Sequence, residues 1–385
     1  MNNVRIGIIG IGTMGSAHAK YLYESEVKGA ELTAVLEVQE EKINWVKENL
    51  QEVEIFTDEN SFFKSDQIDA VLIATPHYDH PRLAVKAFEY GKHVLCEKPA
   101  GVYSKQVREM NEAAESNDLV FSMMYNQRTN PLYQKLRDLI QSGELGEIKR
   151  INWIITNWYR SQSYYDSGGW RATWEGEGGG VLINQCPHQL DLWQWLTGMM
   201  PSRIRAFCYF GKHRNIEVED DVTAFAEYDN GATGVFITTT GEAPGTNRLE
   251  IAGDRGKIVV EDGKLTFWRL RMPEPEFNKE YKGGFGSPEC WKCDIPIDGV
   301  ETGHKGITQN FVDAILTGSP LLAPGTEGIN GLLLSNAMQL STWKDDWVSF
   351  PLAEDEYYEQ LQEKINTSTA KKETKSITLN VHGSH

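Results

Sequence analysis

A glycine-rich turn near the start of the chain constrains the fold more than any other feature. The apolar run from Val4 to Ile9 leads into Gly10, Gly12 and Gly15, which have the G-x-G-x-x-G spacing. Such a run is typical of a buried parallel strand, and helical character follows it. The glycines of such a turn permit a tight bend, a close approach of pyrophosphate to the backbone, and close packing of helix on strand. The turn therefore predicts a dinucleotide-binding strand–turn–helix unit.

A carboxylate and the start of the helix support this interpretation. The next apolar strand, 31–36, ends at Glu37, at about the 20-residue distance from the turn where an acid binds ribose hydroxyls. A carboxylate there would repel a 2′-phosphate, so NAD is favoured over NADP. Thr13 and Met14 open the helix, whose N-terminus favours negative charge. The alternative is a glycine-rich turn in an α/β protein, with Glu37 as an ordinary strand-end acid.

Length and charge restrict the class of protein. The chain has 385 residues and a formal net charge of −17, which allows two domains and argues against nucleic acid or an anionic membrane as a partner. The charge also suggests a substrate that is not strongly anionic, although local patches can override it. No apolar run approaches the roughly 20 residues of a membrane span, and no signal peptide is visible. The predicted location is the cytoplasm.

Cysteine and histidine spacing does not predict a metal site. The five cysteines are scattered, which is typical of free thiols. Cys290 and Cys293 form a lone C-x-x-C motif, but two further zinc ligands at recognisable spacing are not obvious. His77 and His80 are three residues apart directly after a strand, where packing of the cofactor or a loop is the favoured role.

The first 125 residues alternate strands and helices, which predicts an α/β Rossmann domain with a doubly wound parallel sheet and bound NAD. The strand 69–75 ends at Pro76, so Thr75, Pro76 and His77 should lie at the carboxyl edge of the sheet, where ligands bind. Residues 126–366 contain hairpins such as 222–239 and predict an α+β domain with a large open, mainly antiparallel sheet. Long loops are expected over 273–303, and residues 367–385 form a polar tail.

Two further segments carry chemistry. Glu97, Lys98 and Pro99 follow a strand at the predicted cofactor edge. Glycines at 178–180 then lead into a helical stretch with His188 and Asp191, which share a face at i and i+3.

Together these segments resemble the glucose–fructose oxidoreductase / inositol dehydrogenase / rhizopine-catabolism (Gfo/Idh/MocA) family, over about residues 3 to 350. The resemblance implies a Rossmann domain followed by an open-sheet domain, a nicotinamide cofactor, and sugar, inositol or glycoside-like substrates. It also implies a homo-dimer or homo-tetramer that associates through the C-terminal sheet.

The resemblance also implies residue roles. Lys98 would be the catalytic lysine that hydrogen-bonds the reacting hydroxyl, and His188 the acid/base, which suits an imidazole because its pKa lies near neutrality. Glu97 would contact the nicotinamide ribose, and Pro99 is often cis in the family. His80 and Asn126 complete the predicted cofactor-binding set. Inositol dehydrogenase-like members carry an aspartate four residues before the histidine, where this chain has Asn184, so a Lys-Asp-His triad is not expected.

An aromatic and polar cluster is expected to form the substrate wall, because aromatic faces stack on sugar rings while polar groups bind hydroxyls. The predicted substrate residues are Tyr159, Tyr165, Trp170, Arg171, Asn184, His188 and Asp191. The alternative is that the tryptophans of this region simply fill the core.

The predicted function is an NAD-dependent oxidoreductase that transfers hydride between the nicotinamide and a secondary hydroxyl of a cyclic polyol, sugar or glycoside. One alternative is a glycoside-processing enzyme that keeps NAD bound and oxidises the sugar transiently, for example at C3, so that elimination cleaves the glycosidic bond. A second alternative is a non-catalytic NAD-binding sensor. The presence of Lys98 and His188 and the acidic balance of the chain disfavour a DNA-binding regulator.

Overall fold

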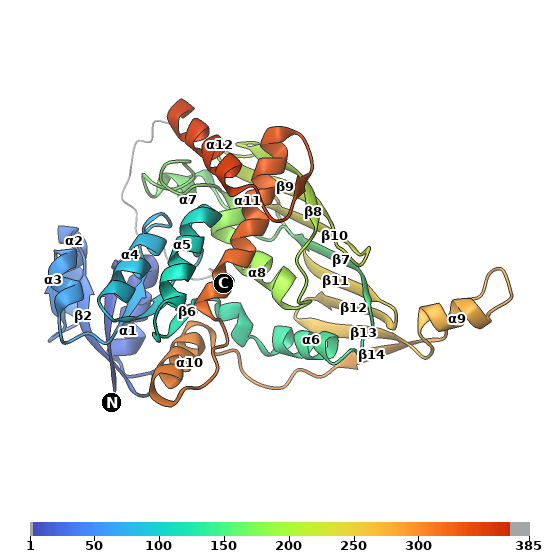
Figure 1. Cartoon of the computed structure of the whole chain (residues 1–385), viewed down its shortest axis with the longest axis horizontal. Helices are drawn as coiled ribbons and strands as arrows, with labels where there is room; N and C mark the ends of the chain where they lie inside the picture. Colours follow the sequence, from blue (N-terminus) through green and yellow to red (C-terminus); the bar gives the residue numbers. More distant parts are fainter. Residues whose placement is uncertain (1–2, 370–385) are drawn as a thin grey trace.

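A computed structural model describes residues 3–369 and places them around two β-sheets (Figure 1). The first sheet lies in the N-terminal part and the second in the C-terminal part, and helices pack between and around them. This arrangement confirms the predicted order of a Rossmann-like unit followed by a unit with an open sheet.

The first sheet has six parallel strands in the order β3-β2-β1-β4-β5-β6. The strand order reverses at β1, which pairs with both β2 and β4, and ligands of doubly wound sheets bind at this switch point. The elements of this part are β1 Val4–Ile9, α1 Thr13–Tyr23, β2 Ala30–Leu36, α2 Glu40–Asn49, β3 Glu54–Phe56, α3 Glu59–Lys64, β4 Ala70–Ile73, α4 Asp79–Glu89, β5 His93–Cys96, α5 Ser104–Glu115 and β6 Phe121–Met123.

The second sheet has nine strands in the order β14-β13-β12-β11-β7-β10-β9-β8-β15. Only the central pair β7–β10 is parallel, so the sheet is mainly antiparallel, and the predicted hairpin 222–239 is β9–β10. The elements are η1 Asn126–Thr129, α6 Pro131–Gln141, β7 Ile148–Ile155, α7 Gln162–Asp166, η2 Val181–Gln185, α8 Pro187–Trp195, β8 Arg203–Phe210, β9 Glu219–Glu227, β10 Thr233–Thr239, β11 Asn247–Gly253, β12 Gly256–Glu261, β13 Lys264–Leu270, α9 Glu274–Glu280, β14 Cys290–Ile295, α10 Gly303–Thr317, η3 Gly325–Glu327, α11 Gly328–Lys344, β15 Val348–Ser349 and α12 Glu354–Thr367.

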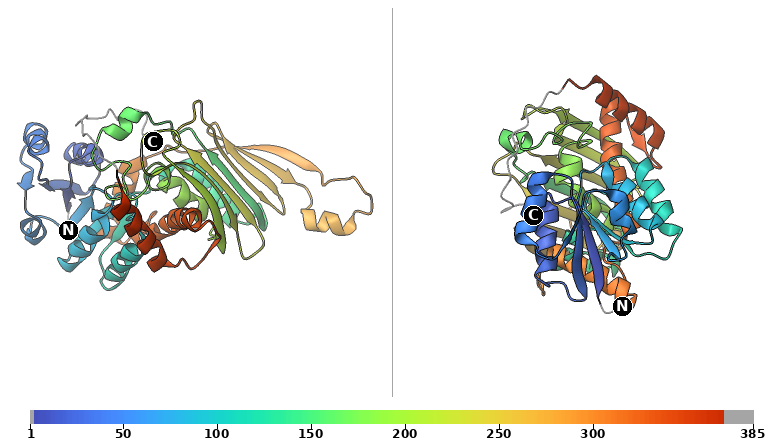
Figure 2. Two further views of the ribbon diagram at one scale, coloured as in Figure 1. Left: turned by 90° about the horizontal axis from the view of Figure 1, so that it is seen from above. Right: turned by 90° about the vertical axis from the view of Figure 1, so that its left-hand side faces the viewer.

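Helices cover one face of the second sheet. Helix α11 packs on β8 and α8, and α6 packs near β13 (Figures 1 and 2). Trp153 on β7, Phe236 on β10 and Trp193 on α8 are buried together beneath these helices. Each large aromatic side chain removes much apolar surface from water, so this cluster is a main source of stability in the second unit.

The long loops expected over 273–303 contain regular structure. Residues 274–280 form α9 and residues 290–295 form β14, which extends the edge of the sheet. With their connecting loops they form an arm that projects from the body of the molecule (Figure 2). The prolines and glycines of this region therefore mark its bends, while α9 buries none of its residues.

The C-terminal part departs from the sequence prediction in one further respect. Helix α10 returns to the first sheet and packs against β1 and β5, so the first unit includes a helix from beyond the predicted boundary at residue 125. Most of the predicted polar tail, residues 370–385, lies outside the described residues.

Candidate active site

The glycine turn is shaped to receive a group that contacts its backbone. Gly10 has φ of +89°, and a Cβ there would lie 2.9 Å from the carbonyl oxygen of Ala74. A Cβ on Gly15 would lie 1.9 Å from the carbonyl oxygen of Gly10, so both positions require glycine. A Cβ on Gly12, in contrast, would meet no atom within 4 Å. Gly12 therefore faces open space at the N-terminus of α1, where Thr13 and Met14 begin the helix.

Glu37 is held against this turn. One carboxylate oxygen accepts a hydrogen bond of 2.8 Å from the backbone N–H of Ile11, and the other accepts bonds from the N–H groups of Val38 and Gln39. The Nζ atom of Lys42 lies 3.8 Å from the carboxylate. These bonds fix the orientation of the carboxylate beside the glycine turn, at the end of β2 where a ribose-binding acid is predicted.

Two histidines link the loops at the carboxyl edge of the first sheet. The ring nitrogens of His80 lie 2.8 Å from the carbonyl oxygen of Thr75 and 2.7 Å from that of Pro99. Both ring nitrogens therefore contact backbone carbonyl oxygens, and His80 stabilises this edge of the sheet. His77 follows Pro76, and its Nδ1 lies 3.2 Å from the carbonyl oxygen of Glu177, in the second unit.

Glu97 ends a buried chain of hydrogen bonds. Its Oε1 lies 2.7 Å from Nε2 of His18, whose Nδ1 lies 2.7 Å from the Tyr21 hydroxyl, and that hydroxyl lies 2.8 Å from the hydroxyl of Thr308 on α10. Burial alone would raise the pKa of Glu97, but the hydrogen bond and charge of His18 outweigh it and lower the pKa to about 2. Glu97 is therefore held as a carboxylate at the predicted cofactor edge.

Lys98 reaches from this edge into the second unit. The Lys98–Pro99 peptide bond is cis, and the Nζ atom of Lys98 donates a hydrogen bond of 3.0 Å to the carbonyl oxygen of Asn184. Burial lowers the pKa of Lys98, and the positive charges of Arg171 and Arg160 act in the same direction. The amine is thus positioned between the two units and releases its proton more readily than a surface lysine.

The side chain of Asn184 is fixed by two neighbours. Its amide group donates a hydrogen bond of 3.2 Å to the Tyr164 hydroxyl and a further bond to the carboxylate of Glu177. The second oxygen of Glu177 accepts a 2.5 Å bond from the backbone N–H of Ala172. Glu177 is buried, so a carboxylate stands directly behind the Asn184 amide.

His188 is buried at the start of α8 and is close enough to Lys98 for their charges to interact. Burial and the charges of Lys98 and His304 lower the pKa of His188 to about 3. Its imidazole is therefore neutral at physiological pH, and its pKa lies well below the near-neutral value expected from the sequence. Its ring also packs edge-on against Tyr125, with ring centroids 6.1 Å apart.

Three buried polar atoms of the predicted site have no hydrogen-bond partner within residues 3–369. They are Oγ1 of Thr75, Oδ1 of Asn126 and Nδ1 of His188. Buried polar atoms are nearly always hydrogen-bonded in native proteins, so these atoms indicate that a polar molecule completes the site. Together with the open space at Gly12 and the fixed carboxylate of Glu37, they fit a bound nicotinamide dinucleotide.

The predicted substrate wall is only partly brought together. Arg171 donates a 2.9 Å hydrogen bond to the Tyr164 hydroxyl, and Trp170 packs edge-on against His77. Tyr165 instead is buried and its hydroxyl donates to Thr240, so its neighbour Tyr164 takes the place beside Asn184. Tyr159 is 51% exposed and lies on a surface pocket rather than beside Lys98.

Asp191 has a partner that the sequence analysis did not anticipate. Its carboxylate accepts two hydrogen bonds, of 2.8 and 2.6 Å, from the guanidinium group of Arg128, and both side chains are buried. Arg128 also binds Glu327 at 2.5 Å. Asp191 and His188 share a helix, but the Asp191 carboxylate binds Arg128 and so joins α8 to η1. A contact between Asp191 and the substrate stays a prediction without geometric support.

Sequence reasoning missed His18 and Glu177, and within the predicted wall it preferred Tyr165 to its neighbour Tyr164. His18 follows the glycine turn by one helical turn, a spacing that would have placed it near the cofactor edge. Tyr164 and Glu177 lie in the mostly irregular segment 156–180, where no periodicity shows which side chains meet.

No group of three His, Cys, Asp or Glu side chains in the described part of the chain could hold a metal ion. None of the described helices is both long and apolar enough to cross a membrane.

Fold and site together define a dinucleotide-binding protein, and comparison with known proteins specifies it further. Residues 4–125 match the model of an oxidoreductase family with an NAD-binding Rossmann fold, and residues 133–259 match the GFO/IDH/MocA C-terminal domain. Together the two ranges cover more than half of the chain. The chain therefore belongs to the Gfo/Idh/MocA family of NAD-binding oxidoreductases.

Relatives of known activity cover most of the chain. Myo-inositol 2-dehydrogenase of Thermotoga maritima is 23% identical over 88% of this chain and 96% of its own length. Levoglucosan dehydrogenase of Pseudarthrobacter phenanthrenivorans is 24% identical over 91% of this chain and 99% of its own length. The WlbA dehydrogenase of Chromobacterium violaceum, solved with NADH and UDP-GlcNAcA, is 27% identical, with a TM-score of 0.77 over 91% of this chain and 97% of its own.

Proposed function

We propose that the protein is a dehydrogenase that oxidises a secondary hydroxyl of a cyclic polyol, sugar or glycoside with NAD⁺. The observation that carries this proposal is the position of Lys98, whose Nζ atom reaches from the carboxyl edge of the first sheet to the carbonyl oxygen of Asn184, four residues before His188 in the second unit. The relatives named as inositol and levoglucosan dehydrogenases act on ring hydroxyls of this kind.

The two side chains have complementary tasks. The bound nicotinamide would accept the hydride from the substrate carbon. His188 is neutral and would take the hydroxyl proton as that C–H bond breaks and the carbonyl forms. Lys98 would donate a hydrogen bond to the same oxygen, which keeps the hydroxyl oriented toward His188.

Asn184 would orient the substrate by accepting a hydrogen bond. Its amide NH₂ group is used by Glu177 and Tyr164, so its Oδ1 is the atom left for a substrate hydroxyl. Glu177 and Tyr164 therefore act as positioning residues: they hold the amide in the orientation in which Asn184 presents an acceptor, as an aspartate at this position would.

The remaining site roles follow the same proposal. Gly12, Thr13 and Met14 would contact the pyrophosphate, and Glu37 the adenosine ribose. Thr75, Glu97 and Asn126 would contact the nicotinamide half, with Pro76, His77 and His80 shaping that edge. Trp170 and Arg171 would line the substrate side.

The decisive experiment offers NAD⁺ and NADP⁺ separately to the purified protein with inositols, free sugars and glycosides, and follows NADH absorbance and products in parallel. Net NADH with an intact ring supports the proposal. A cleaved glycoside without net NADH would replace it by transient oxidation with a retained cofactor, and silence in both channels would favour a non-catalytic NAD-binding protein.

A lysine variant tests the catalytic assignment. Lys98→Met should lower kcat by about a hundredfold or more, while NADH binding, measured by fluorescence, persists. Lys64→Met, on the exposed end of α3, is the matched control and should retain parental kcat. Equal kcat in the parent and Lys98→Met would contradict the assignment.

We also propose that the chain forms a homo-dimer or homo-tetramer through the second sheet. The aromatic side chains of Phe207, Tyr209 and Phe225 are exposed on β8 and β9, on the face opposite the packed helices. Light scattering coupled to gel filtration tests the proposal: Phe207→Lys should lower the molar mass, and a monomeric parent would refute it.

The five free cysteines fit a working place in the reducing cytoplasm, which cell fractionation tests.

A further inference from the structure

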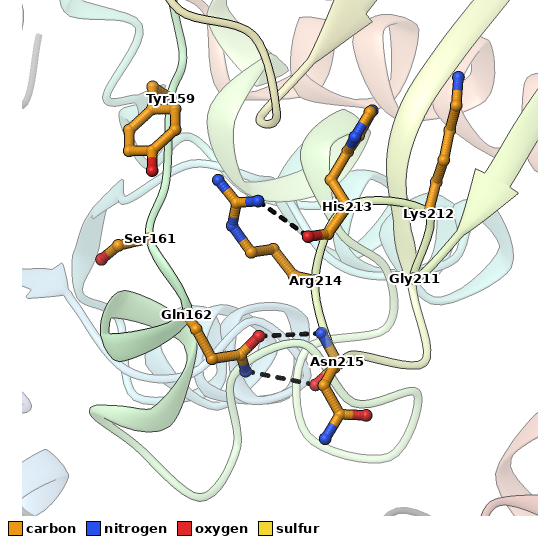
Figure 3. A pocket seen from close by; sticks show the side chains of 8 residues that line it. All are labelled: Tyr159, Ser161, Gln162, Gly211, Lys212, His213, Arg214 and Asn215. Carbon is orange, nitrogen blue, oxygen red and sulfur yellow. Dashed lines mark hydrogen bonds between the residues drawn. The ribbon is translucent and has the colours of Figure 1, made fainter.

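The mechanism above does not use a surface pocket of about 490 Å³ that is lined in part by Tyr159. It lies between the segment 159–162 and the loop 211–215, and Figure 3 shows the Arg214 side chain reaching between Tyr159 and that loop. The guanidinium carbon of Arg214 is 5.1 Å from the centre of the Tyr159 ring.

Hydrogen bonds on two sides hold the loop 211–215 of this pocket in place. The buried carboxylate of Asp220 accepts hydrogen bonds of 2.9, 2.7 and 3.1 Å from the successive backbone N–H groups of Lys212, His213 and Arg214. On the other side, Gln162 pairs with the backbone of Asn215 (Figure 3). The loop is thus preorganised, and a ligand would find Arg214 already positioned.

Neither Arg214, which lines the pocket, nor Arg160, which does not line it but whose carbonyl oxygen Arg214 binds, forms an ion pair with a carboxylate within residues 3–369. The guanidinium group of Arg214 donates to the carbonyl oxygens of Arg160 and His213, and that of Arg160 donates to the carbonyl oxygen of Tyr159. Lys212 and His213 differ, because both contact the carboxylate of Asp221. In a chain of net charge −17, two adjacent arginines directed only at main-chain oxygens form a local positive site.

Of the two arginines, Arg160 approaches residues of the proposed active site. The guanidinium carbons of Arg160 and Arg171 lie 5.2 and 4.7 Å from the centre of the Tyr164 ring. The hydroxyl of that same ring binds the Asn184 amide. Arg160 is also near enough for its charge to lower the pKa of Lys98. A substrate ring beside Asn184 could therefore extend a substituent along Tyr164 toward Arg160 and Arg214.

We infer that Arg160 and Arg214 form an anion subsite, which binds a carboxylate or phosphate substituent of the substrate away from the reacting hydroxyl. Arginine is suited to both groups because its planar fork of N–H donors matches their oxygens. The inference rests on the proposed function and narrows its substrate class to acidic or phosphorylated rings. It also reverses the expectation, drawn from net charge, that the substrate is not strongly anionic.

The test uses three probes with the same ring: glucose, glucuronate and glucose 6-phosphate. Their binding to the NAD⁺-loaded protein is measured by calorimetry at low and high NaCl, and NADH formation is followed in parallel. The parent should bind at least one anionic probe about tenfold more tightly than glucose, and high salt should shrink this difference. A preference for glucuronate identifies a carboxylate substituent, and one for glucose 6-phosphate a phosphate.

The double variant Arg160→Gln/Arg214→Gln should lose the preference, whereas Arg271→Gln, an exposed arginine on the arm, should keep it. Equal binding of all three probes by the parent, or an anionic preference that survives in the double variant, would overturn the inference. Because calorimetry needs no turnover, an anionic preference without any NADH would refute the proposed oxidation of these rings and leave the subsite intact.

Discussion

The carboxylate of Glu177 accepts a hydrogen bond from the side-chain amide of Asn184, so an amide and an acid stand together where the family resemblance leads us to expect a single aspartate. In the proposed function, the pair keeps an oxygen acceptor for the substrate and places the negative charge one side chain further from it. This arrangement explains how the chain can depart from the family pattern at Asn184 and still hold a polar site of defined orientation.

The single substitution Asn184→Asp should lower the stability of the protein. Asn184→Asp would place two carboxylates in contact, and such a pair holds a shared proton with a raised pKa. The folded variant would then bind a proton that the unfolded chain releases, so its stability should fall as pH rises, by about 1.4 kcal/mol per pH unit near neutrality.

Thermal melts between about pH 5.5 and 8 measure this slope. This pH range brackets the pKa expected for the shared proton. Asn184→Asp/Glu177→Gln should recover stability and kcat/KM, because the glutamine amide can donate to the new aspartate. Asn49→Asp on α2 is the exposed control. A pH-independent midpoint for Asn184→Asp would show that the two side chains are not in contact.

Because His188 is buried in its neutral form, we expect the stability of the folded state to be sensitive to acid. Burial and nearby positive charges lower its pKa to about 3, whereas an unfolded histidine titrates near 6.5, so the unfolded chain binds more protons between these values. Stability should therefore fall as pH drops below about 6.5. His188→Gln should make the slope shallower by up to about 1.4 kcal/mol per pH unit, as measured by urea unfolding at a series of pH values. Identical slopes for the two proteins would contradict a buried neutral His188.

The Asp191–Arg128 pair predicts a loss of stability rather than of substrate binding. Asp191→Asn leaves a buried guanidinium with only Glu327 as a charged partner, and breaking a buried pair costs about 3 to 5 kcal/mol. Urea unfolding measures the loss, and Arg203→Met, on a surface pair, should leave the midpoint near that of the parent. KM of Asp191→Asn, measured well below its melting temperature, should stay unchanged. A large rise in KM with unchanged stability would reinstate Asp191 as a substrate ligand.

Glu37 predicts cofactor choice. Its oriented carboxylate should bind the ribose hydroxyls and repel a 2′-phosphate, while Lys42 lies close by. Glu37→Gln should weaken NADH binding about tenfold and improve NADPH binding relative to it, as followed by fluorescence titration. Glu31→Gln, exposed on the same strand, is the control. An unchanged ratio of the two affinities would place the adenosine ribose elsewhere.

The parts that sequence predicted well are those with strong local signals. The strand 4–9, the glycine turn and the hairpin 222–239 each carry a periodicity or a spacing that only one local structure satisfies. The roles of Lys98 and His188 come from the family resemblance and stay predictions. Glu177 was not predicted, because it reaches Asn184 from an irregular segment whose path depends on tertiary contacts. Tyr165 and Tyr164 are adjacent and chemically alike, so only the backbone path decides which of them reaches Asn184.

The return of α10 to the first sheet has a consequence for the order in which the protein matures. The Tyr21 hydroxyl in α1 lies 2.8 Å from that of Thr308, and α10 packs on β1 and β5. Ribosomes synthesise chains from the N-terminus, so residues 303–317 emerge long after the strands that they cover. The half of the protein that binds dinucleotide therefore stays incomplete until most of the chain has been translated.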